Sequence, residues 1–127
     1  MIVVETSALM EVILDGPLAD ACTAVLESGD ASAISAGTLA EALVVASRRR
    51  LGRAVASLVR GLGAEIVPVT GATARRVSDA YDRWGKGVHP ARLDFGHCFA
   101  YAFAEERGCP LLFVGDEFSR TDIPSCL

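Results

Sequence analysis

The chain begins with a short apolar run that ends in an acidic residue, MIVVETS at residues 1–7, and a similar run, LLFVGDE, lies at residues 111–117. Both runs have the length and composition of buried strands in a parallel sheet. In an open α/β sheet, ligand sites form beyond the carboxyl ends of the strands. Glu5 and Asp116 are therefore expected at the same edge of one sheet. Carboxylates gathered in this way repel one another and lose solvation, so they usually hold a hard cation.

The chain between these two runs alternates between helical and strand-like patterns. Two further strands are expected at residues 31–35 and 65–69, and helices at 6–14, 18–28, 37–50, 53–62, 70–84 and 94–107. No tight hairpin signal separates the strands. The pattern predicts an α/β fold, a three-layer α/β/α sandwich with a mostly parallel central sheet.

Length and composition limit the class of protein. The 127 residues, of which 51% are hydrophobic, predict a single domain over residues 1–127 and exclude a disordered chain. No apolar stretch reaches the roughly 18 residues of a membrane span, and Glu5 and Glu11 interrupt the first apolar segment, which argues against a signal peptide. A cytoplasmic protein without a membrane partner is expected. The four cysteines form no Cys-x-x-Cys motif, so a zinc or redox site is not indicated.

Charge is unevenly distributed along the chain, whose net charge is −4. Residues 1–47 carry seven acids and no base, whereas all twelve basic residues, eleven of them arginine, lie from position 48 onward. The overall acidity argues against non-specific binding of polyanions. The preference for arginine suits either contact with phosphate or pairing with carboxylates, and composition leaves both open.

Several acidic residues have both an ordinary and a functional interpretation. Glu5, taken alone, is explained by the dipole of the helix that follows it. Glu41 lies in LAEALVVA at residues 39–46, a helix apolar on nearly every face, so it either occupies a narrow exposed strip beside Arg48 or is buried for a purpose. Asp94 is explained at least as well by helix capping as by function. His97, one turn later, is a half-buried core histidine, a metal ligand or a proton carrier.

Two adjacent acids, Asp116 and Glu117, follow the last strand, and they form either a polar turn or part of a cation site. Each acidic signal is weak alone. The ordered set, with every acid at the expected end of its element, favours a shared site.

Five stretches of the chain together resemble the PIN-domain ribonucleases and, more narrowly, VapC-type toxins of toxin–antitoxin pairs. They are VVETSAL (3–9), LAEALV (39–44), YDRWGKGVHP (81–90), LDFGHCF (93–99) and LLFVGDEFSRTDI (111–123). The resemblance implies a small α/β nuclease whose acids bind Mg²⁺ or Mn²⁺ and which cleaves RNA, plausibly a structured RNA such as tRNA. It also implies a homodimer whose activity a cognate VapB-type antitoxin inhibits.

The chain departs from the family pattern at two of its four acids. Glu5 stands where the family normally has Asp, and its side chain is longer by one C–C bond, about 1.5 Å. His97 stands where the family has Asp, and Asp94 stands where it has Asn three residues earlier. Histidine removes a negative charge and favours Mn²⁺ or a later metal over Mg²⁺. Activity is therefore expected to be reduced unless Asp94 or Glu117 restores the charge.

The resemblance suggests a role for each candidate residue. The catalytic and metal-binding group comprises Glu5, Glu41, Asp94, His97, Asp116 and Glu117. The residues expected to orient phosphate or water are Thr6, Ser119 and Thr121. The residues expected to contact RNA are Arg48, Arg83, Lys86, Arg92 and Arg120, although each alone is explained better as part of a solvated helix face.

Two other interpretations compete with a metal-dependent endoribonuclease. A PIN fold with decayed catalysis would act as a binding module for RNA or an antitoxin, and the altered acids favour it. A flavodoxin-like or receiver domain would need a phosphate-binding loop or a switch lysine near a strand end, and neither is present.

Overall fold

The computed structural model describes all residues, 1–127, and contains one four-stranded sheet. Its strands are β1 (Ile2–Val4), β2 (Ser32–Ser35), β3 (Glu65–Val67) and β4 (Leu111–Leu112), in the order β3-β2-β1-β4. All three pairings are parallel, which confirms the predicted sheet. β1 pairs with β2 through Ile2 and Ser32 and with β4 through Val3 and Leu111, so β1 is a central strand. The residue that follows β1 therefore emerges in the middle of the carboxyl edge.

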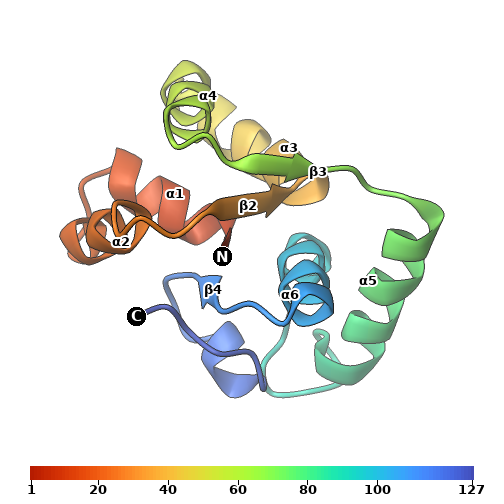
Figure 1. Ribbon diagram of the computed structural model, residues 1–127. Helices are drawn as coiled ribbons and strands as arrows, with labels where there is room; N and C mark the ends of the chain where they lie inside the picture. Colours follow the sequence, from red (N-terminus) through yellow and green to blue (C-terminus); the bar gives the residue numbers. More distant parts are fainter.

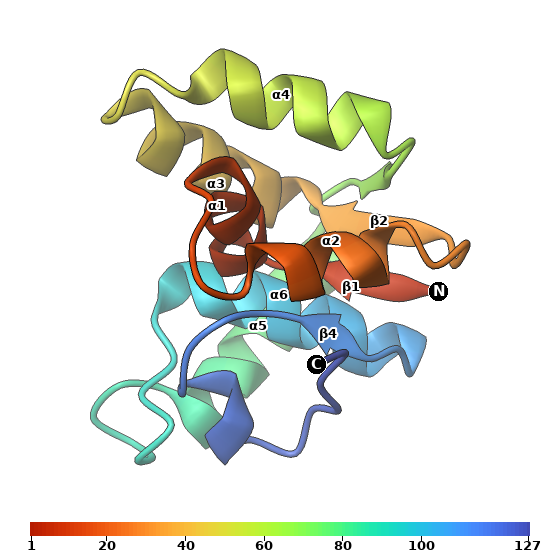
Figure 2. The same ribbon diagram turned by 90° about the vertical axis from the view of Figure 1, so that its left-hand side faces the viewer.

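Six α-helices and one 3₁₀ turn accompany the sheet. They are α1 (Thr6–Ile13), α2 (Ala19–Leu26), α3 (Ala36–Ser47), α4 (Gly52–Gly61), α5 (Gly71–Trp84), α6 (Phe95–Arg107) and η1 (Phe118–Arg120). Helices α1 to α4 lie on one side of the sheet, and α5 and α6 lie on the other (Figures 1 and 2). The predicted three-layer α/β/α sandwich is confirmed. No helix has the length and apolar character needed to cross a membrane.

Alternation along β1 builds a core on each face of the sheet. Val3 is fully buried in the cluster formed with α5 and α6, which includes Tyr101 and Phe118. Val4 packs in the opposite cluster, against Leu9 of α1 and Ala42 of α3. Because successive side chains of a strand point to opposite faces, this three-residue strand contributes to both cores.

Capping explains where the two helices on the second face begin. Thr70 and Thr73 form a reciprocal capping box at α5, and Asp94 and His97 form one at α6. Helix α6 ends at Gly108, whose φ of 62° is the left-handed conformation that glycine adopts without strain. Both caps agree with the sequence-based expectation. Most predicted strands and helices are longer than the observed ones, although α4 has the predicted length. Strand β3, for example, stops at Val67, because Pro68 has no N–H to continue the ladder.

Candidate active site

Glu5 lies at the carboxyl end of β1 and is buried, with 2% of its surface exposed. It is the N-cap of α1: Ser7 N–H donates to its Oε2 over 2.8 Å, and the Ser7 hydroxyl also contacts that oxygen. Ser7 Oγ in turn accepts a hydrogen bond of 2.9 Å from Val114 N–H, beyond β4. Glu5 is therefore at the start of α1, as the helix-dipole interpretation requires, and it caps that helix. Through its bonds to Glu5 and Val114, Ser7 connects the ends of two adjacent strands.

Burial is the main influence on the Glu5 carboxyl. Loss of solvation raises its pKa, while the hydrogen bonds from Ser7 and the nearby His97 imidazole lower it, and the Glu41 carboxylate raises it again. The pKa of Glu5 is raised overall. A buried carboxyl with a raised pKa at a sheet edge is typical of a functional site, because a purely structural cap has no need to be desolvated.

Glu41 comes to the same place from helix α3. Thr6 Oγ1 donates a 2.8 Å hydrogen bond to Glu41 Oε1, so Thr6 orients this carboxylate. The Glu41 carboxyl group lies so close to Gly96 of α6 that a Cβ at position 96 would overlap it. The half-buried Glu41 therefore does not lie on an exposed strip beside Arg48, and a glycine at the start of α6 makes its position possible.

Asp94 and His97 form the N-terminus of α6, next to Gly96. Asp94 Oδ1 accepts a 2.8 Å hydrogen bond from His97 N–H, and Asp94 N–H donates to His97 Nδ1 over 3.1 Å. The Asp94 side chain is 55% exposed and that of His97 is 21% exposed. The capping interpretation of Asp94 is confirmed. His97 is half-buried as expected, but one edge of its ring faces the pocket described below.

Asp116 and Glu117 are exposed in the turn between β4 and η1. Gly115 precedes them with a φ of 111°, and Glu117 Oε2 lies 2.8 Å from the place that a Cβ on Gly115 would take. Ser119 Oγ donates to the Asp116 carbonyl over 2.6 Å and stabilises the turn. The Asp116 carboxylate itself extends into solvent and is available to a ligand.

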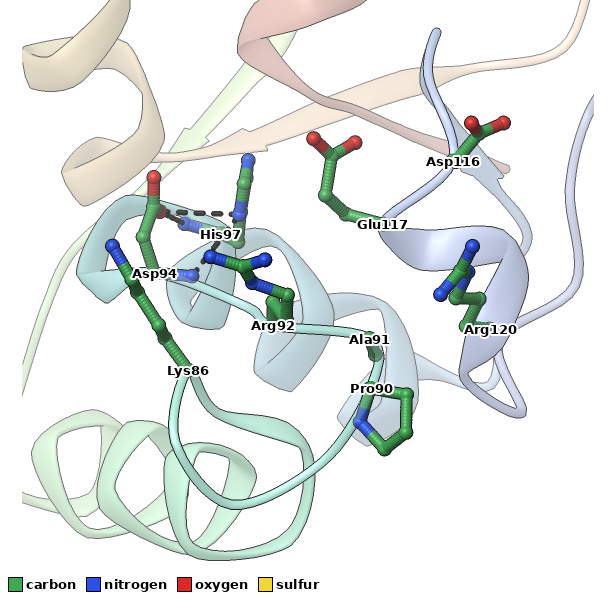
Figure 3. A pocket seen from close by; sticks show the side chains of 9 residues that line it. All are labelled: Lys86, Pro90, Ala91, Arg92, Asp94, His97, Asp116, Glu117 and Arg120. Carbon is green, nitrogen blue, oxygen red and sulfur yellow. Dashed lines mark hydrogen bonds and ion pairs between the residues drawn. The ribbon is translucent and has the colours of Figure 1, made fainter.

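A polar pocket of about 440 Å³ opens at this edge of the sheet (Figure 3). Acidic side chains, basic side chains and one imidazole share its wall. The residues that line it are Lys86, Pro90, Ala91, Arg92, Asp94, His97, Asp116, Glu117 and Arg120. A surface that combines carboxylates with guanidinium and ammonium groups suits a ligand that bears both phosphate and bound cations.

The structure separates the residues predicted to contact RNA. Lys86, Arg92 and Arg120 line the pocket. Arg83 instead pairs with Asp122 at 3.0 Å and with Glu105 at 3.6 Å, and its guanidinium lies over the Trp84 ring. Its charge joins α5 to the C-terminal segment and Arg83 does not line the pocket, so its position gives no support to the predicted contact with RNA.

Arg48 is exposed at the C-cap of α3 and does not line the pocket.

Two of the residues predicted to orient phosphate or water, Ser119 and Thr121, have hydrogen-bond partners outside the acidic set. Besides the Ser119 bond, Thr121 Oγ1 donates to the Phe118 carbonyl over 2.6 Å and accepts from Ile123 N–H over 3.2 Å. The hydroxyl groups of Ser119 and Thr121 therefore donate to backbone carbonyls and stabilise turns. Of the three predicted residues, only Thr6 donates to a carboxylate of the acidic set.

The acids lie at one edge, as expected, but no three acidic or histidine side chains are grouped closely enough to hold a metal ion. Glu5 and Glu41 are near enough for the Glu41 carboxylate to raise the pKa of Glu5, but neither lines the pocket, whereas Asp116 and Glu117 lie on its wall. Chemically the set fits a hard divalent cation, because it offers carboxylate oxygens and Gly96 leaves room for that of Glu41. Asp116 would have to turn toward Glu5 for three carboxylates to converge.

Two residues of the site were not predicted to have this importance. Ser7 was not among the predicted site residues, although it follows an acid at a strand end. Gly96 was not singled out, yet a glycine in the first turn of a helix rich in large apolar residues is a signal of close approach.

Comparison with known proteins places the chain in a family. The PIN domain family model matches residues 2–124. Ribonuclease VapC42 of Mycobacterium tuberculosis is 36% identical over 129 residues, with 98% of each chain covered.

Two solved structures share the fold. VapC20 of Mycobacterium tuberculosis, described as a toxin that cleaves the sarcin-ricin loop, matches with a TM-score of 0.78 at 18% identity, covering 97% of this chain and 96% of that one. A toxin–antitoxin complex from Klebsiella pneumoniae matches with a TM-score of 0.71 at 16% identity, covering 96% and 93%. With the family match and the VapC42 identity beside this shared fold, the chain belongs to the PIN domain family and, within it, to the VapC group.

Proposed function

We propose that this chain is a divalent-metal-dependent endoribonuclease, the toxin of a VapBC-type pair, which hydrolyses RNA phosphodiester bonds with Mg²⁺ or Mn²⁺. The observation that carries the proposal is the position of Glu5. A carboxyl group is buried at the end of the central strand, where the oriented carboxylate of Glu41 and the imidazole of His97 both influence its pKa, and His97 lines a pocket with three basic side chains. The ribonuclease names of the relatives support the same activity.

Different residues of the site would bind the cation and the substrate. Glu5, Glu41 and Asp116 would hold the divalent ion, with Asp94 or Glu117 adding charge at its periphery. When bound, such an ion polarises the scissile phosphate and lowers the pKa of a water ligand. Thr6 keeps Glu41 in place through its 2.8 Å hydrogen bond.

Basic side chains hold the RNA backbone over the acids. Lys86, Arg92 and Arg120 face the pocket, and their charges offset the repulsion between phosphate and the acidic set. Arginine provides two parallel N–H donors to a phosphate, whereas lysine acts as a point charge. The substrate class is therefore RNA held by its backbone, with structured RNA such as tRNA the preferred candidate.

The remaining features of the proposal concern the assembly. The toxin–antitoxin complex among the structures with this fold supports a VapB-type antitoxin as partner. We also propose a homodimer located in the cytoplasm.

The direct test is cleavage of a mixed RNA pool by purified, antitoxin-free protein, titrated separately with Mg²⁺ and Mn²⁺. Cleavage that requires the metal and disappears in Glu41→Gln supports the nuclease. Gln matches Glu in length and can still accept from Thr6, so the control removes charge while keeping shape.

A second candidate function is a binding module with decayed catalysis. It is favoured by the absence of three converging ligands and by histidine at position 97. Silence of the folded protein with both metals, together with retained RNA binding, would establish it instead.

A further inference from the structure

A second hollow, of about 560 Å³, lies beside the pocket, at the loop that joins α5 to α6. Lys86, Pro90 and Arg92 line both the pocket and this second hollow, so these side chains form the wall between the two. We call the second one the loop hollow. Its complete lining consists of Lys86, Gly87, Val88, His89, Pro90 and Arg92.

The loop hollow differs from the pocket in its charge. Three carboxylates, those of Asp94, Asp116 and Glu117, line the pocket together with its basic side chains. No carboxylate lines the loop hollow, whose charged side chains are Lys86 and Arg92. An anion in the pocket therefore needs a cation to offset the acids, whereas an anion in the loop hollow meets positive charge alone. The loop hollow is suited to a phosphate group that has no metal ion bound to it.

Hydrogen bonds join the two ends of this loop. Lys86 N–H donates to the Leu93 carbonyl over 2.9 Å, and Leu93 N–H donates to the Trp84 carbonyl over 3.0 Å. The Tyr81 hydroxyl of α5 donates to the Lys86 carbonyl over 2.8 Å. The backbone from which the Lys86 side chain extends is therefore held on both sides (Figure 3).

His89 and Arg92 fix the middle and the end of the loop. His89 Nδ1 accepts from Ala91 N–H over 3.0 Å, and the imidazole packs edge-on against Trp84 with centroids 4.6 Å apart. Arg92 has a φ of 56°, which is uncommon for a residue other than glycine, and its N–H donates to the His89 carbonyl over 3.0 Å. Such a conformation persists only where its surroundings hold it. The loop thus presents its two basic side chains from a preorganised backbone, which lowers the entropic cost of binding a ligand.

We propose that the loop hollow binds a second phosphate of the RNA strand, next to the phosphate that lies over the acids in the pocket. This inference rests on the proposed function for the identity of the substrate. Because Lys86 and Arg92 form the wall between the two hollows, a strand that crosses this wall places successive phosphates on its two sides. The pocket then holds the phosphate that reacts, and the loop hollow holds its neighbour without a metal ion.

Val88 allows the charge of the loop hollow to be changed while every residue of the pocket stays the same. Val88 is 56% exposed and lines the loop hollow but not the pocket. Val88→Lys adds a positive charge and Val88→Asp a negative one, and Val88→Asn, which has the shape of Asp without its charge, is the neutral reference. Val69→Asp controls for net charge, because the exposed Val69 precedes α5 and the loop follows it, about 20 Å away along the helix.

RNA affinity is measured in EDTA with a short single-stranded RNA, so that neither cleavage nor metal contributes. We expect Val88→Lys to bind about threefold more tightly, and Val88→Asp about threefold more weakly, than Val88→Asn. Val69→Asp should bind as the parent does. The slope of log affinity against log salt should steepen by about 0.7 in Val88→Lys, the value for one further phosphate contact on a single strand. Equal affinities in Val88→Lys and Val88→Asp would overturn the proposal, as would equal losses in Val88→Asp and Val69→Asp.

Kinetics test whether the second phosphate is bound throughout the reaction. In metal-dependent cleavage, Val88→Asp should have a higher KM than Val88→Asn at the same kcat, because a phosphate that does not react is bound equally in the ground and transition states. A lower kcat at the same KM would overturn this role.

Polyglutamate tests for an acidic protein as the occupant, because it carries negative charge without phosphate. If the charge at residue 88 changes the affinity for polyglutamate but not for RNA, the loop hollow binds an acidic protein and the proposal is wrong. The proposed nuclease activity can fail independently. If RNA affinity follows the expected order but neither metal supports cleavage, the phosphate site stands and the nuclease proposal fails.

Discussion

Gly96→Ala places a methyl group in the space that the Glu41 carboxylate occupies. The Cβ would lie 2.7 Å from Glu41 Oε1 and closer still to the rest of the carboxyl group. A separation under 3.0 Å requires movement, and the flexible end of Glu41 can move more readily than the backbone of α6. The Glu41 side chain is therefore expected to leave its place beside Glu5.

The cost of this movement can be estimated from the structure. Displacement breaks the 2.8 Å bond from Thr6 Oγ1, a hydrogen bond to a charged group worth about 1.5–3 kcal/mol. Alanine recovers up to about 1 kcal/mol of helix propensity. With that recovery the free energy of unfolding should fall by only about 0.5–2 kcal/mol. Mg²⁺ affinity and RNA cleavage should each fall at least about tenfold, because one carboxylate has left the set.

Gly52→Ala is the matched control, because Gly52 also lies in the first turn of a helix, α4, and a Cβ there would meet nothing within 4 Å. It should leave metal affinity and cleavage unchanged. Stability is followed by urea unfolding, metal binding by calorimetry and activity by gel-based cleavage. Parental metal affinity and cleavage in Gly96→Ala would refute the inference that Glu41 acts from its position beside Glu5.

Three further predictions concern the acids and the bases. The pKa of Glu5 is raised, so above the ordinary pKa of 4.5 the metal-free native protein binds more protons than the unfolded chain. Its free energy of unfolding should therefore fall as pH rises through the raised pKa. Urea unfolding of Glu5→Gln should not show this fall with pH. Asp116→Asn should abolish cleavage while leaving the unfolding midpoint within error, because the Asp116 side chain is exposed; an unchanged cleavage rate would exclude it from the site. Arg120→Ala should weaken RNA binding and reduce its salt dependence in filter-binding assays, because Arg120 lines the pocket. Arg83→Ala should bind RNA normally and lower the free energy of unfolding by less than about 1 kcal/mol. Equal losses of RNA affinity in the two variants would contradict the assignment of RNA contact to Arg120 and of ion pairing to Arg83.

The fold could be predicted because its signals are local. Apolar runs bounded by acids mark β1 and β4, and Thr70 and Asp94 mark the starts of α5 and α6. Strand lengths were overestimated because apolar residues continue beyond the last ladder hydrogen bond, as at Phe113, which is buried but lies outside β4.

The site could be predicted only in part, because side-chain partners are set by residues distant in sequence. That Glu5 and Glu41 meet followed from the topology, but that Arg83 is paired with Asp122, 39 positions later, did not. The capping bonds between Asp94 and His97 are local and could have been predicted from the spacing of the two residues. The packing of the His97 ring against Phe118 could not, because Phe118 lies far along the chain.

The most direct test of the account is anomalous diffraction from crystals of the antitoxin-free protein soaked in Mn²⁺. We expect one strong anomalous peak at the carboxyl edge of the sheet, within ligand distance of the carboxylates of Glu5, Glu41 and Asp116. A fully soaked crystal with no peak between these carboxylates would refute the proposed metal site.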